Sequence, residues 1–167
     1  MNYLDQLKYD ELFFEADALI AEKKTLDAMQ ILEGIIIENP EYGKAYNHLG
    51  WIFETKYKNL EKAEEMYKKC IFYTPNYTPV YFNLSVLLST LGKYEEQEAH
   101  LKQALTITGI EKSSIYNEMG ILYELKSDYT KAVACYKDAI RSSLNSTSIE
   151  TYKASIERCK YKTEILG

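Results

Sequence analysis

Several classes of protein are excluded by what the sequence lacks. No apolar run approaches the roughly 18 residues that a membrane span requires, and the longest, GIII at 34–37, has a glutamate on each side. The first residues, MNYLDQLKYDELFF, lack the basic segment and the uninterrupted apolar stretch of a secretory signal. We therefore expect a cytoplasmic protein with no membrane partner.

Cysteine and histidine are also scarce. Cys70, Cys135 and Cys159 cannot all pair with one another, and no two of them have CxxC spacing, so we expect buried, reduced thiols. His48 and His100 each lack a second histidine or cysteine at metal-binding distance in sequence, which argues against a zinc site. The sequence predicts neither a metal nor another cofactor.

Charge and motifs narrow the function further. A net charge of −5 gives no reason to expect nucleic acid or an anionic membrane as partner. No phosphate-binding glycine loop, nucleophile elbow or HExxH motif is present, so we do not expect an enzyme.

What the sequence does contain is a repeated pattern. Four segments, LFFEADAL from Leu12, YNHLGWIF from Tyr46, YFNLSVLL from Tyr81 and YNEMGILY from Tyr116, begin 34, 35 and 35 positions apart. In each segment a large apolar residue is followed four positions later by a small one, which is Ala16, Gly50, Ser85 or Gly120. A repeat of this length predicts a stacked array of small structural units.

A second block follows each segment at a nearly constant distance, from Ala28, Ala63, Gln97 and Ala132. Pro40, Pro75 and Gly109 close the first three units. Proline disfavours helix at the residue before it, and glycine accepts the left-handed backbone that ends a helix. Each unit is therefore expected to be two short helices joined by a turn.

This pattern resembles the tetratricopeptide repeat, whose signature is W-x2-L-G-x2-Y, then A-x3-F, then P. The second unit carries the most complete match, at Tyr46, Leu49, Gly50, Phe53, Ala63, Tyr67 and Pro75. In the first unit Glu15 stands where leucine is usual, and in the third unit Gln97 replaces the small alanine.

The resemblance implies an all-α fold, a right-handed α-solenoid of four tetratricopeptide-type helix pairs followed by a C-terminal capping helix. We expect a single repeat domain over 1–167, with repeats at 9–42, 43–77, 78–112 and 113–146 and the capping helix at 147–165. Thr147 and Glu150 have the spacing of a capping box at the start of that helix, and Ile149, Tyr152, Ile156, Cys159 and Ile165 form its apolar stripe.

Glycine sets the expected packing within a repeat. Tyr46, Leu49, Gly50 and Phe53 lie on one helical face, which we expect to pack on the second helix of the same unit. The missing side chain at Gly50 lets the two axes approach closely. Gly34 falls inside a second helix and is interpreted as another close crossing.

Trp51, the only tryptophan, lies about 150° around the helix from the centre of that face. In the family that the chain resembles, the first helices of successive repeats line a concave groove that binds peptides or partner segments. The resemblance therefore places an apolar strip and a set of polar groups in the groove. The strip is Phe13, Trp51, Phe82, Val86 and Ile121, and the polar groups are Asp17, Asn47, His48, Asn83, Asn117 and Glu118.

On this interpretation Trp51 is an exposed anchor and the asparagine amides hydrogen-bond an extended peptide. The alternative is that some of these side chains only pack between neighbouring first helices, and for Phe82 both possibilities stay open. Phe14 is expected to be structural, and His100 to lie on a solvated helix face.

The predicted function is a non-enzymatic adaptor that binds a peptide or helical segment of a partner protein, with a weak preference against acidic ligands. Some family members grip the carboxylate of heat-shock chaperones with lysine, arginine and asparagine; only Asn83 fits that clamp here, so chaperone-tail binding is not expected. Two alternatives remain: a secretion-type chaperone, and a structural subunit or homodimer whose groove is filled by its partner chain.

Overall fold

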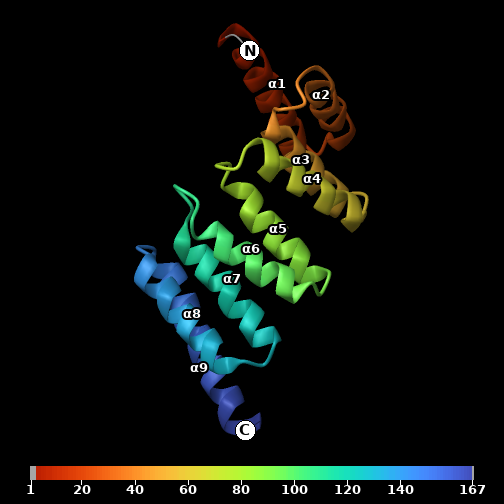
Figure 1. The fold of residues 1–167 in the computed structure, drawn as a ribbon. Helices are drawn as coiled ribbons and strands as arrows, with labels where there is room; N and C mark the ends of the chain where they lie inside the picture. Colours follow the sequence, from red (N-terminus) through yellow and green to blue (C-terminus); the bar gives the residue numbers. More distant parts are fainter. Residues whose placement is uncertain (1–2, 167) are drawn as a thin grey trace. The chain divides into compact units, whose positions relative to one another are not determined.

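The structure, a computed structural model, describes the backbone of residues 3–166 and the side chains of residues 6–166. Within this range every regular element is a helix (Figure 1). The helices are α1 (Tyr3–Ala21), α2 (Thr25–Glu38), α3 (Gly43–Thr55), α4 (Leu60–Tyr73), α5 (Pro79–Thr90), α6 (Tyr94–Ala104), α7 (Lys112–Leu125), α8 (Tyr129–Ser142) and α9 (Ser146–Leu166). The all-α fold class predicted from the repeats is confirmed.

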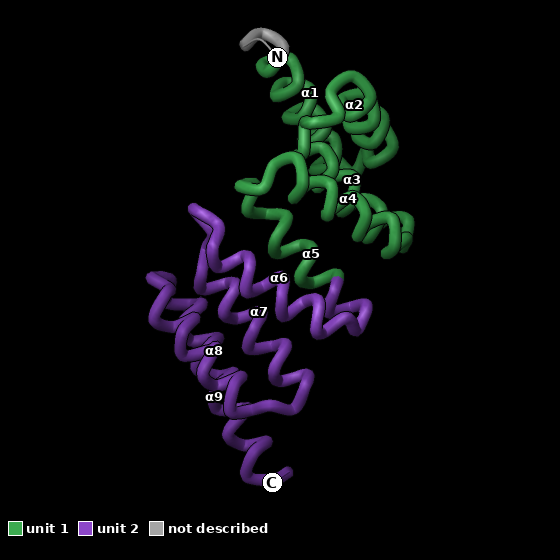
Figure 2. Tube along the Cα trace, in the orientation of Figure 1, with its two compact units in different colours: residues 1–87 green, residues 88–167 purple. Residues whose placement is uncertain are grey.

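The chain forms two compact units, residues 1–87 and 88–167, which are described separately (Figure 2). The first unit contains α1 to α4 and most of α5, and the second contains α6 to α9.

In the first unit α3 packs against α4 at Gly50. A Cβ atom at this position would lie 2.6 Å from Cε1 of Tyr67, so the tyrosine ring occupies the space that the glycine leaves. The Tyr67 hydroxyl donates to Glu54 Oε2 at 2.7 Å. Burial and this hydrogen bond raise the pKa of Tyr67. The predicted role of Gly50 is confirmed.

The second unit repeats the same arrangement between α7 and α8. A Cβ at Gly120 would lie 2.5 Å from Cε1 of Tyr136, and the Tyr136 hydroxyl donates to Glu124 Oε2 at 3.0 Å. A tyrosine over a glycine, with its hydroxyl on a glutamate of the first helix, is thus the shared packing element of the two pairs.

Gly34 has a different role from the one predicted. It is exposed, and a Cβ there would meet nothing within 4 Å, so no helix crosses at this point. The prediction of a close crossing is wrong.

Side-chain caps mark the starts of α4 and α8. Asn59 and Asp128 cap α4 and α8, because their side-chain oxygens accept from the backbone N–H of Lys62 and Lys131 at 3.0 and 3.1 Å. Pro40 and Pro75 follow the ends of α2 and α4, as expected from the sequence.

The turn inside each helix pair needs one residue in the left-handed conformation. Lys23, Lys58, Gly92 and Ser127 fill this position, with φ of 64°, 54°, 69° and 59°. Three of the four are not glycine, which strains the backbone at those turns.

Helix α9 covers the end of the second unit. Its buried residues are Tyr152, Ser155, Ile156 and Cys159, whereas Ile165 is exposed, so the predicted stripe stops before the last turn. The predicted capping box at Thr147 is wrong: Asn145 Oδ1 accepts from the Ser148 backbone N–H at 2.9 Å and caps the helix instead.

A cluster of charges fixes α9 to α7. Arg158 donates from Nε and one terminal nitrogen to the two carboxylate oxygens of Glu124, both at 2.8 Å, and Lys162 Nζ donates to the same group at 2.7 Å. These contacts and the Tyr136 hydrogen bond lower the pKa of Glu124 to about 2. The cluster is a bidentate pair on a nearly buried carboxylate.

The prediction that the three cysteines are buried is confirmed. Cys70, Cys135 and Cys159 are buried and unbridged. Burial raises the pKa of Cys70 to about 12 and those of Cys135 and Cys159 to about 11, so the protonated thiol is strongly favoured.

His100 does not lie on a solvated face. It is buried in α6 together with Gln97, Leu101 and Ala104. These four positions have the spacing of one helical face, and the histidine belongs to that face.

Candidate functional site

A cavity of about 210 Å³ lies in the first unit, between α1, α3 and α5. These three are the first helices of successive repeats. The residues that line the cavity are Asp17, Ile20, Asn47, His48, Trp51 and Asn83. All except Ile20 were predicted from the sequence to lie in the groove.

Trp51 reaches this cavity because it points away from the packing face of its own helix pair. Gly50, its neighbour in sequence, faces Tyr67 of α4, whereas Trp51 is 40 % exposed. Phe82 on α5 is 43 % exposed. The predicted exposure of Trp51 is confirmed, and the open question for Phe82 is resolved in favour of exposure.

The two asparagines of the cavity bond each other. Asn83 Nδ2 donates to Asn47 Oδ1 at 2.9 Å, which ties α5 to α3. Asn47 is buried and its Oδ1 accepts from Asn83, although the asparagine amides were expected to hydrogen-bond an extended peptide. The amide nitrogen of Asn47 and the amide oxygen of Asn83 lie outside this hydrogen bond.

His48 joins α3 to α1. Its Nε2 lies 3.1 Å from Asp17 Oδ1, and the centre of its ring lies 4.5 Å from that of Phe13 in an edge-to-face contact. The imidazole is mostly covered, but the Asp17 side chain is 62 % exposed. Asp17 therefore presents a carboxylate at the surface, and its contact with the covered imidazole of His48 orients it.

The exposure of the two phenylalanines of α1 is the reverse of the predicted one. Phe13, expected in the exposed strip, is 7 % exposed and packs under His48 and Tyr42. Phe14, expected to be structural, is 67 % exposed. The two residues that cover Phe13 belong to α3 and to the position just before it, and this contact is not visible in the periodicity of α1 alone.

Ile20 is the lining residue that the sequence prediction missed. It follows Asp17 by three positions, so both lie on one side of α1. This spacing would have identified it.

The remaining predicted residues divide between the units. Val86, on α5 in the first unit, is half-buried. Asn117, Glu118 and Ile121 lie on α7 in the second unit. Glu118 is buried, which raises its pKa, and Asn117 Nδ2 lies 3.5 Å from its Oε1. Glu118 is therefore not an exposed groove carboxylate, and this part of the prediction is wrong.

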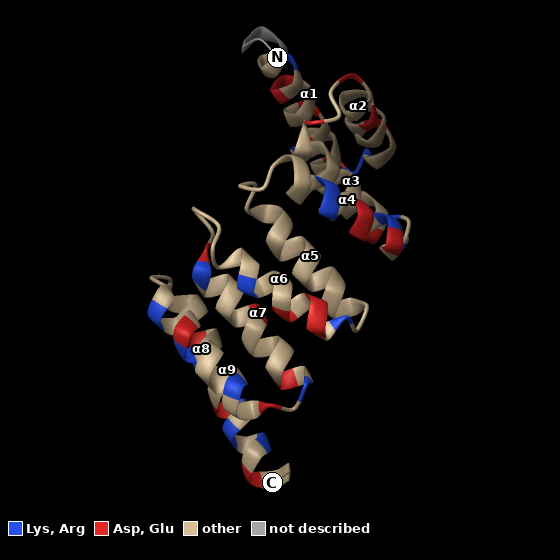
Figure 3. Cartoon of the chain, in the orientation of Figure 1, with Lys and Arg blue, Asp and Glu red and all other residues tan. Residues whose placement is uncertain are grey.

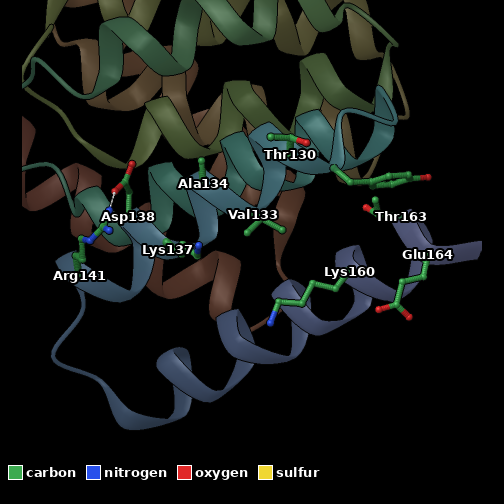
Figure 4. A pocket seen from close by; sticks show the side chains of 10 residues that line it. Thr130, Val133, Ala134, Lys137, Asp138, Arg141, Lys160, Thr163 and Glu164 are labelled. Atoms are coloured by element: carbon green, nitrogen blue, oxygen red, sulfur yellow. Dashed lines mark hydrogen bonds and ion pairs between the residues drawn. The ribbon is translucent and has the colours of Figure 1, made fainter. Parts of the chain in front are cut away.

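A larger cavity, of about 660 Å³, lies in the second unit between α8 and α9 (Figure 4). Val133 and Ala134 are apolar residues of its lining, and Lys137 of α8 and Lys160 of α9 also line it. Arg141 is paired with Asp138, and Lys160 with Glu157 at 2.7 Å. The sequence prediction did not find this cavity, because its residues form no motif of the repeat.

Among the residues that the structure describes, no group of three or more side chains is placed to bind a metal ion. None of the helices, within the part of the chain that the structure describes, is long and apolar enough to cross a membrane.

The helix pairs and the cavity on their first helices define a repeat protein of the solenoid class, and comparison with known proteins gives the family. The family profile described as "Tetratricopeptide repeat" matches residues 43–77, 78–109 and 113–146, more than half of the sequence. The chain belongs to the tetratricopeptide repeat family.

Solved structures agree with this assignment at the level of the fold. The chain is similar to PilF of Pseudomonas aeruginosa, with a TM-score of 0.81 and 19 % identity over 93 % of this chain and 69 % of that one. It is also similar to TTC0263, a tetratricopeptide protein of Thermus thermophilus, with a TM-score of 0.66 and 21 % identity over 89 % and 81 % of the chains.

One curated relative is similar in sequence. The uncharacterized protein y4yS of Sinorhizobium fredii is 26 % identical over 80 residues, which are 48 % of this chain and 43 % of that protein. The chain thus spans less than half the length of this relative.

Proposed function

We propose that this chain is a non-enzymatic adaptor that binds a segment of a partner protein on the first helices of its repeats. Tetratricopeptide repeats form protein–protein interaction modules, and the family members are in general non-enzymatic scaffolds, which supports the proposal. The binding surface in the first unit comprises the six residues of the 210 Å³ cavity and Phe82 beside Asn83 on α5.

The observation that carries the proposal is the exposed Trp51 at a cavity that also offers polar groups. An indole supplies a large contact area at low entropy cost, and aromatic residues are enriched at the centres of protein interfaces. Asp17 and the Asn47–Asn83 amide pair, which all line the cavity, supply polar groups for directional contacts. A few polar groups in a mostly preformed concave site are typical of a binding site.

The proposal includes a cytoplasmic location and binding without catalysis. Three buried, protonated thiols suit a reducing compartment. The cavity combines one carboxylate and one imidazole with amide and apolar groups, a set suited to holding a ligand.

The test compares Trp51→Ala with Phe72→Ala. Phe72 is an exposed aromatic residue of the same unit, on α4, outside the cavity. Proteins that the wild type retains from a lysate of its source cells are quantified by mass spectrometry for all three forms. We expect Trp51→Ala to retain them at least tenfold less, a typical interface hot-spot effect, and Phe72→Ala to match the wild type. Equal retention by Trp51→Ala would overturn the proposal.

A further inference from the structure

We infer that the cavity of the first unit receives the cationic side chain of a lysine or arginine from an extended partner segment. This inference rests on the proposed function and specifies the chemistry of the ligand. It follows from the charge, the aromatic surface and the size of the cavity.

The charge at the cavity is negative. Asp17 is the one carboxylate among the described residues that line it, and no lysine or arginine lines it. The Asp17 side chain is largely exposed, and its hydrogen bond is to His48 Nε2 rather than to a permanent cation. Helix α5, which forms one wall, carries no charged residue along its whole length (Figure 3). A ligand cation therefore meets an attractive carboxylate with no lysine or arginine beside it at the lining.

The remaining walls suit the rest of such a side chain. Trp51 and Ile20 are apolar surfaces along which the methylene stem of lysine or arginine can lie while its charged end stays at the water boundary. The indole of tryptophan is also the strongest aromatic partner for a cation. Trp51 and Asp17 thus offer two separate attractions to one cationic side chain.

The size of the cavity suits one long side chain. Its volume of about 210 Å³ lies below the roughly 300–1,000 Å³ of pockets that hold drug-sized ligands. The Asn83–Asn47 hydrogen bond at 2.9 Å holds two of the walls together, so the space exists before the ligand arrives. An extended segment can insert one long side chain here and pass over Phe82.

Three peptides of the form acetyl-Ala-Ala-X-Ala-Ala-amide test the inference, with lysine, norleucine or glutamate at X. Trp51 is the only tryptophan, so its fluorescence and its indole N–H signal in NMR report on this cavity alone. We expect the lysine peptide to bind about tenfold more tightly than the norleucine peptide, which has the same apolar stem without the charge. The glutamate peptide should bind most weakly.

Two variants of α1 locate the charge that is responsible. Asp17→Asn keeps the size of the side chain and should reduce the preference for lysine over norleucine to within about threefold. Glu15→Gln makes the same change of charge on an exposed residue about 160° away around the helix, and should leave the preference intact. A preference that survives Asp17→Asn, or equal binding of lysine and norleucine peptides by the wild type, would overturn the inference.

The peptide test and the partner-retention test can fail independently of each other. If Trp51→Ala loses its partners while the wild type fails to distinguish lysine from norleucine, the adaptor function stands and the cationic ligand is wrong. If Trp51→Ala retains its partners although lysine peptides bind, the cavity recognises cations but is not the adaptor surface.

Discussion

Single residues decide how closely the helices of a repeat approach. Gly50 and Gly120 each face a tyrosine ring that occupies the space of a side chain, while Gly34 faces open space. The three glycines lie in the same kind of helix pair, so they allow a controlled comparison of packing against helix propensity.

We predict that Gly50→Ala destabilises the protein by about 1–3 kcal/mol, because its Cβ would overlap the Tyr67 ring in a packed core. Gly34→Ala should instead stabilise by up to about 1 kcal/mol, because alanine is the better helix former and nothing is displaced. Urea unfolding followed by circular dichroism measures both. Equal effects of the two substitutions would contradict the packing role of Gly50.

The left-handed turn residues give a second prediction at this scale. Ser127 has a φ of 59°, whereas Gly92 fills the corresponding turn position with a φ of 69°. Ser127→Gly should raise the free energy of unfolding by about 0.5 kcal/mol, since glycine adopts this conformation without steric strain. Thermal unfolding checks the sign; a lower midpoint would show that the turn carries no such strain.

At the scale of the elements, a single carboxylate, that of Glu124, joins α9 to α7. Glu124 of α7 accepts hydrogen bonds from Arg158, Lys162 and the Tyr136 hydroxyl, and these contacts lower its pKa to about 2. A carboxyl whose pKa is lower in the folded state stabilises above its unfolded pKa. That stabilisation is lost as the pH falls through the folded pKa.

We predict that Glu124→Gln lowers stability by about 1–3 kcal/mol at pH 7, a range reduced from the full pKa shift because Arg158 and Lys162 are partly exposed. The difference from wild type should shrink as the pH falls from about 4.5 towards 2. Glu150→Gln, which removes an exposed pair with Lys153, serves as the control and should change little. A difference that does not depend on pH would contradict this account of the cluster.

The elements were largely predictable from the sequence, because a helix pair is encoded locally by repeated small and large residues and by the prolines that follow. The cap of α9 was misplaced by two residues, since Thr147 and Asn145 both have side chains that can cap a helix and only the folded backbone selects one. His100 was misjudged by its residue type, although its spacing from Gln97 and Leu101 marked the buried face.

Most of the residues that line the cavity of the first unit could be predicted from the sequence, but the exposure of several other predicted residues could not. Helical periodicity correctly predicted that Trp51 points away from Tyr67, because that orientation depends on one helix pair. It could not show that His48 and Tyr42 cover Phe13, or that Glu118 is buried, because these depend on tertiary contacts. The larger cavity between α8 and α9 lies outside the repeat signature altogether.

The whole molecule consists of two compact units of one repeat family, and each has a cavity of its own. The adaptor surface is proposed for the first unit, where an exposed indole and an exposed carboxylate meet. The central claim is therefore that a partner segment contacts Trp51.

The most direct measurement replaces Trp51 with the photo-cross-linking residue p-benzoylphenylalanine and identifies the cross-linked peptides by mass spectrometry. The same replacement at Phe72, exposed on α4 of the same unit, is the control. The account predicts that position 51 cross-links a defined partner segment with a lysine or arginine at or next to the attachment point, and that position 72 does not. Identical cross-links from both positions, or none from position 51 while the partner remains bound, would contradict it.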